Sequence, residues 1–363
     1  MKKIRFLYGT HSDFSQELDK RVQNYFRETQ LSPFANPELI IVTILFLLLY
    51  FGAYTAIISN QFSRGYMLLF TVVMGISFPS IFLNIAHTAA HKAFSKNKHV
   101  NKWLLTSLEL IGMNAYIFEY LHNKVHHTFT SIEGVDVIVD DFSLIRLSEK
   151  QPYRRMHYYQ VWYAPFLYLL FSINLVFSGD FQLFKRQRMG NIFPVNHPRK
   201  AFVALYAYKL FYVFYMLVIP MLVLDVAWWE VLLGFLLMHA IGSIFFTCIG
   251  VLNHQIDESI FPEFDEDGYI HDYQKNHELA VTIDFSPHSK LATYLFGGFN
   301  THVAHHLYPG ICHCHYPAIT RIVSATAREY GLAYKSFSLW GAIGSHFRYL
   351  RRLSVPPVLR TAA

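Results

Sequence analysis

The sequence predicts an all-α integral membrane protein with four transmembrane helices arranged in two hairpins. Of its 363 residues, 53% are hydrophobic and only 15% are charged. A soluble domain usually has about a quarter charged residues, so this composition is typical of a chain that lies in a bilayer. Four separate segments are also apolar over about 20 residues, which is the length that a helix needs to cross the hydrocarbon core.

Each predicted hairpin consists of two apolar segments joined by a short turn. Residues 39–59 contain no charged side chain, and residues 66–86 follow after one turn. The second pair comprises residues 201–224 and 231–251, which an acidic and aromatic turn joins. The polar segments between and after the two hairpins are then expected to form a helical cap.

The positive charges predict how these segments are oriented. Of the 31 Lys and Arg residues, only Arg64 lies in the turn at residues 59–65, none lies in the turn at residues 225–230, and Lys209 lies inside a span. The others fall in the N-terminal, central and C-terminal polar regions, which the positive-inside rule assigns to the cytoplasm. We therefore expect a multi-pass protein of a bacterial inner membrane or the endoplasmic reticulum, with both termini and the cap cytoplasmic.

The remaining segments fit one membrane domain with an N-terminal extension. Residues 1–38 are mostly polar and predict a cytoplasmic arm, and residues 39–363 predict a single membrane domain. Two further apolar stretches, residues 103–121 and 161–178, are interrupted by polar residues or proline. A crossing by either stretch would move the following segments to the other side of the bilayer, so we interpret both as interfacial or re-entrant helices.

Histidine is the most informative residue type, because it gathers in three clusters just beyond apolar segments. Histidines three or four residues apart lie on one face of a helix, so each cluster can direct several imidazoles to one point. Imidazole suits iron, copper and zinc. One ion needs fewer ligands than the clusters offer, so they predict a dinuclear active site at the cytoplasmic surface. Its candidate residues are His87, His91, His122, His126, His127, His302, His305 and His306.

With these clusters, the chain resembles the integral-membrane fatty acid desaturases, especially the front-end acyl-lipid or acyl-CoA branch and its bacterial relatives. The resemblance covers about residues 81–332, and it includes KAFSK after the first cluster, TFT after the second and GGFN before the third. It implies desaturation of a fatty acyl chain, carried by CoA, acyl carrier protein or a lipid. It also implies two iron ions, Fe2+ or Fe3+, with O2 as co-substrate, and contact with membrane lipid but not with nucleic acid.

Two departures from the family pattern limit what the resemblance implies. Front-end enzymes typically have Gln at the first position of the third cluster, whereas this chain has His302. The position of the double bond therefore cannot be transferred. The fused cytochrome b5 domain of many front-end enzymes is also absent, because His197 and Pro198 are followed by Arg199 and Lys200 and not by two glycines. We expect a separate electron donor, such as ferredoxin or cytochrome b5.

The resemblance also implies residues around the three clusters. Family members have a further histidine ligand at the cytoplasmic end of the fourth span, which implies His254 as a ninth metal ligand and Asn253 as its outer partner. Carboxylates are expected to orient the ligands, although each candidate can equally be a solvated surface residue. The candidates are Glu119, Asp136, Asp140, Asp141 and Asp284.

The other histidines receive simpler interpretations. His239 lies inside a span and is expected to be a polar packing residue. The alternating cysteines and histidines at residues 312–315 are expected to pack against the catalytic face, because residues so close in sequence cannot easily complete a tetrahedral zinc site. A third set is expected at the surface or the membrane interface, and it consists of His11, His99, His157, His197, His271, His288 and His346.

Two other classes of function remain as alternatives. A hydroxylase, acetylenase or alkane monooxygenase would use the same di-iron site and give a different product. A metal transporter or sensor would need polar ligands along the spans, whereas these histidines cluster at the span ends.

Accessibility tags test the predicted topology. A tag in residues 59–65 or 225–230 is expected to react with an impermeant reagent only from outside, and a tag at either terminus only from the cytoplasmic side. An external C-terminus would separate the third histidine cluster from the first and contradict a shared site.

Overall fold

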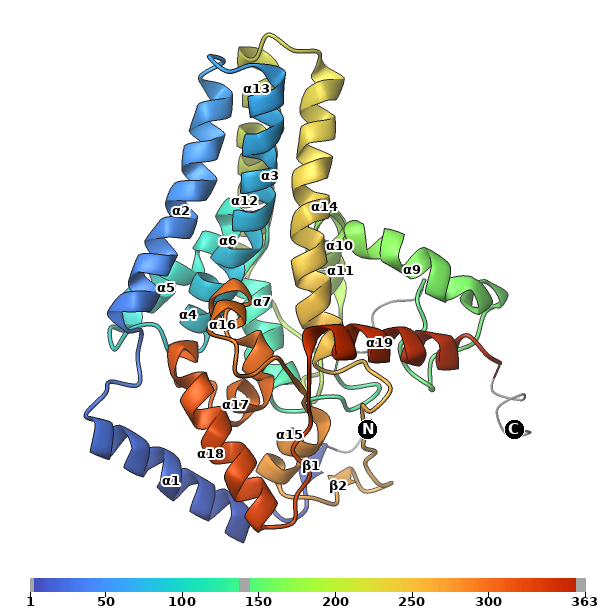
Figure 1. Cartoon of the computed structure of the whole chain (residues 1–363). Helices are drawn as coiled ribbons and strands as arrows, with labels where there is room; N and C mark the ends of the chain where they lie inside the picture. The colour runs from blue at the N-terminus through green and yellow to red at the C-terminus, as the bar shows by residue number, and fades with distance from the viewer. Residues whose placement is uncertain (1–2, 137–143, 357–363) are drawn as a thin grey trace.

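The computed structural model describes residues 3–136 and 144–356 of the chain. Long apolar helices stand side by side at one end of the molecule, and shorter helices form a broader layer at the other end (Figure 1). Four helices are long and apolar enough to cross a membrane, as the sequence predicts. They are α2 (Pro37–Ile58), α3 (Arg64–Ser80) continued by η1 (Ile81–Ala86) and α4 (His87–Ala90), α12 (Arg199–Val213) continued by η5 (Phe214–Val218) and α13 (Ile219–Val223), and α14 (Trp228–Leu252).

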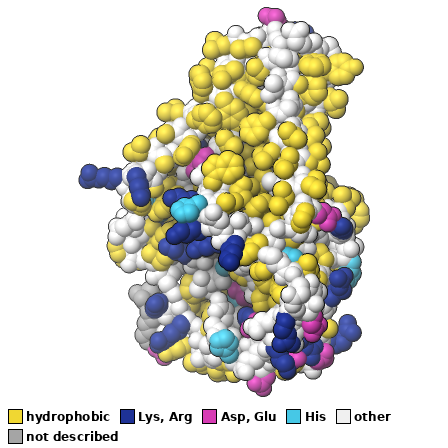
Figure 2. Space-filling model, turned by 90° about the vertical axis from the view of Figure 1, so that its left-hand side faces the viewer, with side chains coloured by type: hydrophobic (Ala, Val, Ile, Leu, Met, Phe, Trp, Pro, Cys, Tyr) yellow, Lys and Arg dark blue, Asp and Glu magenta, His cyan; other side chains and the backbone are white. Residues whose placement is uncertain are grey.

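The four long helices present an apolar surface to their surroundings. In the most apolar 18-residue stretch of α2, only 17% of the residues are buried inside the protein, against 61% in the stretch that includes α3. Helix α3 packs against both α2 and α14, which explains its greater burial. Figure 2 shows hydrophobic side chains over the long helices and Lys and Arg side chains gathered below them. This boundary between apolar and basic surface is the one expected at a membrane face.

Glycine allows α3 and α14 to approach closely. A Cβ atom added at Gly75 would lie 2.8 Å from the Cβ of Ile241, and one added at Gly242 would lie 2.4 Å from the ring of Phe78. Phe78 is fully buried and cannot move aside without disturbing its neighbours. Small residues that let helix backbones approach are characteristic of membrane helix packing.

The broader layer is built from short helices and two small parallel strand pairs. Strand β1 (Arg5–Phe6) pairs with β2 (Tyr269–Ile270), and β3 (Asp284–Phe285) pairs with β4 (Ser336–Phe337). The helices of this layer are α1 (Asp13–Thr29), α5 (Lys98–Leu105), α6 (Ser107–Leu110), α7 (Ala115–Leu121), η2 (His122–His126), α15 (Gln274–Val281), α16 (Lys290–Leu295), η6 (Phe299–Thr301), α17 (His302–Leu307), η7 (His313–His315), α18 (Tyr316–Glu329) and α19 (Leu339–Leu353).

The N-terminal residues are packed into this layer. Helix α1 is amphipathic and places Phe14, Leu18 and Val22 in a buried cluster with residues of α18. Arg21 of α1 also forms an ion pair of 2.6 Å with Glu329 of α18. The pairing of β1 with β2 adds a second connection. The same buried cluster contains Val303 and Ala304 of α17, so residues of the predicted arm help to hold the helix that carries the third histidine cluster.

The two additional apolar stretches do not form straight spans. Residues 103–121 are divided among α5, α6 and α7, none longer than eight residues. Residues 161–178 lie in a helix pair that bends by 65°, which makes it a broken span or a re-entrant segment. That pair consists of η3 (Arg155–Tyr159) and α9 (Gln160–Leu169), followed after the bend by α10 (Phe171–Asn174), η4 (Leu175–Gly179) and α11 (Asp180–Lys185).

Polar side chains attach the bent helix pair to the long helices. The hydroxyl of Ser172 lies 2.8 Å from Nδ1 of His239, and the other ring nitrogen of His239 lies 2.8 Å from the hydroxyl of Tyr212. His239 therefore acts as a polar packing residue, as predicted. Lys209 of α12 donates a hydrogen bond of 2.6 Å to Asp180 of α11, and both side chains are buried.

The expectation that His157 and His346 lie at the surface is wrong. They are only 2% and 3% exposed. His346 lies on the inward face of the amphipathic helix α19, where its Nδ1 donates to the carbonyl of Gln255 and its other ring nitrogen contacts the hydroxyl of Tyr168. The sequence marks both residues as polar, but the docking of their helices decides which face is covered.

The close approach of α3 and α14 predicts the effect of adding one methyl group. Gly242→Ala is expected to lower the melting temperature, because the new Cβ meets the buried Phe78 ring and overpacking costs about 1–3 kcal/mol. Gly250→Ala in the same helix is the control, since no atom lies within 4 Å of its added Cβ. Thermal unfolding in detergent or nanodiscs measures both, and equal melting temperatures for the two variants would contradict this account of the packing.

Candidate metal centre

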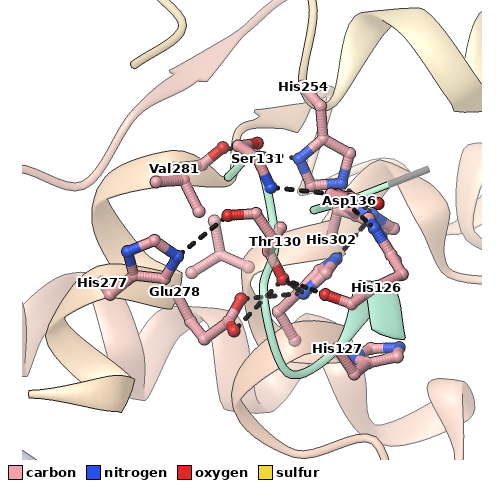
Figure 3. Close-up of polar contacts among 12 residues, drawn as sticks. His126, His127, Thr130, Ser131, Asp136, His254, His277, Glu278, Val281 and His302 are labelled. Carbon is pink, nitrogen blue, oxygen red and sulfur yellow. Dashed lines mark hydrogen bonds and ion pairs between the residues drawn. The ribbon is translucent and has the colours of Figure 1, made fainter. Parts of the chain in front are cut away.

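The three histidine clusters and His254 meet where the long helices join the broader layer. His87 and His91 follow η1 at the end of the α3 segment, and His254 follows the last turn of α14. The second cluster lies on η2, and the third lies on α17. All nine predicted ligands are therefore brought together, although they come from four separate parts of the chain. Figure 3 shows His126, His127, His254 and His302 of this assembly with their polar neighbours.

A π-helical turn determines how the second cluster is divided. In η2 the backbone N–H of His127 donates to the carbonyl of His122, five residues earlier. Their Nε2 atoms lie 3.2 Å apart, so both rings face the same side. His126 faces another direction and contacts Asp136. Single π turns often occur at functional sites, because the additional residue in the turn redirects the side chains.

The ring nitrogens form two groups of four and one overlapping group of three, and within each group the candidate ligand atoms all lie within 4.8 Å of one another. The group of three consists of His127, His305 and His306, so His127 lies between the two groups of four. Its ring centre is 4.6 Å from that of His305 and 4.5 Å from that of His306. The His87 group consists of His87, His91, His122 and His305, and the His126 group consists of His126, His254, His302 and His306.

The nitrogen spacing within each group fits ligands that share one metal ion. The Nε2 atoms of His87 and His122 are 2.9 Å apart, and the Nε2 atom of His302 lies 3.0 Å from that of His254 and 3.1 Å from that of His306. A metal–nitrogen bond is about 2.0–2.1 Å long, so two ligands at right angles are about 2.9 Å apart. The separations are therefore those of neighbouring ligands around an ion.

The protonation of these rings also fits metal binding. Burial lowers the pKa of His91 and of His254 to about 3, and the nearby His126 contributes in the same direction. Burial and neighbouring imidazoles hold the pKa well below 6.5 at five further ligands outside the spans, which are His122, His127, His302, His305 and His306. These seven rings are neutral near pH 7, as a metal ligand must be.

Some buried ring nitrogens have no protein partner. Nε2 of His91 and Nε2 of His305 are both inaccessible to solvent and lack a hydrogen bond within the described part of the chain. An unpaired buried polar atom costs free energy, and most such atoms in proteins are satisfied. A bound metal ion would satisfy both of these nitrogens. This observation, the nitrogen spacing and the neutral rings all indicate that the cluster is suited to metal.

Asp136 is the sequence-predicted carboxylate that contacts a candidate ligand directly. Nδ1 of His126 donates to Asp136 over 3.0 Å, and the backbone N–H of Ser131 donates to the same oxygen. Burial alone would raise the pKa of Asp136, but the imidazole of His126 and this backbone donor hold it below its usual value. A carboxylate that accepts from one ring nitrogen leaves the other nitrogen free to bind metal.

The other predicted carboxylates differ in position. Asp284 contacts no imidazole but accepts the backbone N–H of Val303 over 2.8 Å, and so fixes the start of α17. Burial raises its pKa to about 7. Glu119 is half-buried, and no described contact of its carboxylate reaches a candidate ligand, although its backbone carbonyl accepts the N–H of His122. Asp140 and Asp141 lie outside the described residues.

Glu278 also contacts a candidate ligand, although no sequence pattern predicts this. Its Oε2 lies 2.9 Å from Nδ1 of His306, and its Oε1 accepts a hydrogen bond from Thr130 over 3.1 Å (Figure 3). Burial raises the pKa of Glu278 well above its usual value. A glutamate in the short helix α15 gives no local signal of this role, because only the packing of α15 against α17 brings it to the histidine.

Asn253 does not have its predicted role. Its amide donates hydrogen bonds to the backbone carbonyls of Ile249 and Phe299, both over 3.1 Å. It therefore connects the end of α14 to the segment before α17. Nδ1 of His254 instead lies 3.4 Å from the carbonyl of Val281. Although Asn253 is next to a candidate ligand in the sequence, its side chain joins two backbone segments.

The cysteine and histidine loop packs against the first cluster. The ring nitrogens of His313 lie 2.9 Å from the hydroxyl of Thr88 and 3.2 Å from the amide oxygen of Asn84. His315 contacts the carbonyl of Phe34. Neither histidine belongs to a metal-binding group among the described residues.

Aromatic rings cover the cluster on the side of the long helices. The ring centres of Phe299 and His87 are 4.5 Å apart, and Phe118 stacks on His122 at 5.0 Å. Phe82 contacts both phenylalanines. A cavity of about 490 Å³ lies farther out between the long helices, and its lining contains no histidine. The cluster thus has an apolar wall toward the helices and carboxyl groups toward the opposite layer.

Comparison with known proteins identifies the family. Residues 63–338 match the family model described as fatty acid desaturase. The chain is 30% identical to the sn-1 linoleoyl-lipid 6-desaturase of Arthrospira platensis, across 96% of this chain and 95% of the relative. It is 29% identical to the protein of the same name from Synechocystis, across 96% and 98%. It is 28% identical to the acyl-lipid (8-3)-desaturase of Physcomitrium patens, across 97% and 74%.

These matches confirm the resemblance inferred from the histidine clusters. The family is membrane-bound and implies a metal centre, a fatty acyl substrate and a redox partner. The chain belongs to the fatty acid desaturase family and is an oxidoreductase that desaturates fatty acyl chains.

Proposed function

We propose that the protein desaturates a lipid-linked fatty acyl chain at a di-iron centre held by the nine histidines. The observation on which this rests is the pair of four-histidine groups, whose neutral nitrogens face one another inside the protein. The lipid-linked substrate is supported by relatives of similar length that are named for linoleoyl-lipid desaturation.

The metal in this proposal is iron. When bound, two irons reduced by external electrons would supply the oxidising power, with O2, that no amino-acid side chain has for an unactivated alkyl chain. An all-imidazole ligand set also suits copper and zinc, but zinc has no redox chemistry. The nine histidines hold the metal, and Asp136 and Glu278 orient His126 and His306.

In this proposal the protein positions the acyl chain and excludes water from the metal centre. Seven of the nine candidate ligands are buried, and His91 and His127 are half-buried. The apolar wall of Phe82, Phe118 and Phe299 lies beside the His87 group. We propose that the acyl chain approaches along this wall, because an apolar chain is stabilised by contact with aromatic side chains. The dry surroundings would protect the reaction from water.

The membrane arrangement belongs to the same proposal. The four long helices would cross the bilayer as two hairpins, α2 with α3 and the α12 segment with α14. The remaining layer would form a cytoplasmic cap that carries the dinuclear centre. The apolar surface of the helices and the basic side chains below it support this orientation. The bent pair at residues 155–185 would dip into the bilayer without crossing it, which keeps all nine histidines on one side.

Electrons would come from a separate protein such as ferredoxin or cytochrome b5. Within residues 3–136 and 144–356, every set of side chains grouped closely enough to hold a metal belongs to this one cluster. An external donor follows from the need for two electrons per double bond.

Product and metal analysis test the proposal together. Expression in a host of defined lipid composition is expected to give a new double bond in a lipid-linked acyl chain, and the purified active protein is expected to hold about two irons per chain. Mass spectrometry distinguishes a double bond from a hydroxyl group or a triple bond. Full activity with one zinc and no iron would contradict the di-iron centre.

Substitution at the third cluster tests the ligand assignment. His302→Ala is expected to abolish activity and lower iron content, because its nitrogen lies within 3.1 Å of two other ligands. His302→Gln should retain part of both, since the front-end pattern has Gln there. His313→Ala is the comparison, and it should leave iron content unchanged because His313 contacts Thr88 and Asn84. Normal iron in His302→Ala with loss of iron in His313→Ala would reverse the assignment.

A further inference from the structure

The two histidine groups differ in what their outward-facing nitrogens contact. A histidine that binds metal through Nε2 has its Nδ1–H free to donate to a second group. The identity of that acceptor changes how strongly the imidazole donates to the metal, and it fixes the orientation of the ring. The two groups can therefore be compared acceptor by acceptor.

The His126 group contacts two carboxyl groups and one carbonyl. Asp136 accepts from His126 over 3.0 Å, Glu278 lies 2.9 Å from Nδ1 of His306, and the carbonyl of Val281 lies 3.4 Å from Nδ1 of His254. Asp136 and Glu278 are 0% and 2% exposed. Water therefore screens their interaction with the histidines very little.

The His87 group has no equivalent of these carboxyl groups. Nδ1 of His305 lies 3.3 Å from the hydroxyl of Tyr316, which is a neutral partner. For His87, His91 and His122, no carboxyl group of the described residues is within hydrogen-bonding distance of a ring nitrogen. Nδ1 of His127, between the two groups, also has no partner among these residues.

This difference in hydrogen-bond partners favours cation binding at the His126 group. All nine ligands are imidazoles, so the type of ligand does not distinguish the two groups. Asp136 and Glu278 bring two buried carboxyl groups next to the His126 group alone, and a carboxyl oxygen beside Nδ1 of a ligand makes that imidazole a stronger donor to a cation. Loss of such an outer partner typically lowers metal affinity 10- to 100-fold.

We propose that the two metal positions are unequal, and that the His126 group binds its ion at least tenfold more tightly than the His87 group because Asp136 and Glu278 support it. This inference rests on the proposed dinuclear centre. It adds an order of filling, in which the His126 position is occupied first as metal becomes available.

The experiment isolates each position before comparing them. Of the two groups of four, His87→Ala with His91→Ala leaves only the His126 group intact, and His254→Ala with His302→Ala leaves only the His87 group. His127→Ala is included in both proteins, because it also removes the group of three that His127 forms with His305 and His306. Each full-length protein is dialysed without oxygen against chelator-buffered Fe2+, and bound iron is measured. We expect the first protein to bind iron at least tenfold more tightly than the second. Melting temperatures of the metal-free proteins identify any variant that does not fold.

Asp136→Asn and Glu278→Gln are then added separately to each background. Each is expected to weaken iron binding about 10- to 100-fold where only the His126 group remains, and to leave it unchanged where only the His87 group remains. Because either variant can be scored alone, a folding defect in one leaves the other as the test. Glu119→Gln is the matched control, since it removes a carboxylate that contacts no candidate ligand, and it should change neither affinity.

Equal affinities of the two isolated groups would overturn the inference, and so would an equal loss in both backgrounds with Asp136→Asn or Glu278→Gln. Either result would leave the desaturase proposal intact, because two equal irons can still serve the reaction. Absence of iron binding by the unsubstituted protein would instead contradict the di-iron proposal itself, and the inference with it.

Discussion

The rest of the structure depends on holding nine imidazole rings together, seven of them buried and two half-buried. Each buried ring nitrogen needs a partner, and a ring without one costs free energy. Outward-facing nitrogens reach Asp136, Glu278, Tyr316 and the carbonyl of Val281. Inward-facing nitrogens meet one another at ligand spacing. Neutral rings can share this space because burial suppresses their protonation, and the same condition prepares them to bind metal.

This requirement explains why the long helices and the opposite layer are joined so tightly. Gly75 and Gly242 bring α3 and α14 into close contact, so the ends of these two helices bring the first cluster and His254 to one level. The second and third clusters approach from the opposite layer on η2 and α17. A π turn in η2 then directs His122 to one group and His126 to the other, whereas residues four apart on a regular helix face the same side.

The same architecture separates two environments around one centre. Phenylalanine side chains cover the histidines toward the membrane helices, whereas carboxyl groups lie on the other side. An acyl chain and the supporting acids therefore approach from different directions and do not compete for space. Because both carboxyl groups lie beside the His126 group, the centre has two unlike halves despite its uniform ligands. The third cluster joins these halves, because His305 belongs to one group and the adjacent His306 to the other.

The sequence by itself determined the membrane helices and the residues that gather at their ends. Residues 39–59 were predicted to span and α2 covers Pro37–Ile58, because a run of apolar side chains has one stable environment whatever surrounds it. The histidine clusters were visible because short spacing on a helix is a local property. Only the tertiary structure decided which histidines share a group and that Glu278 lies beside His306. It also decided that the Asn253 side chain binds backbone carbonyls and not the ring of His254, and that His157 and His346 are buried. These features depend on contacts between segments far apart in the chain, and no pattern within one segment encodes how another will pack against it.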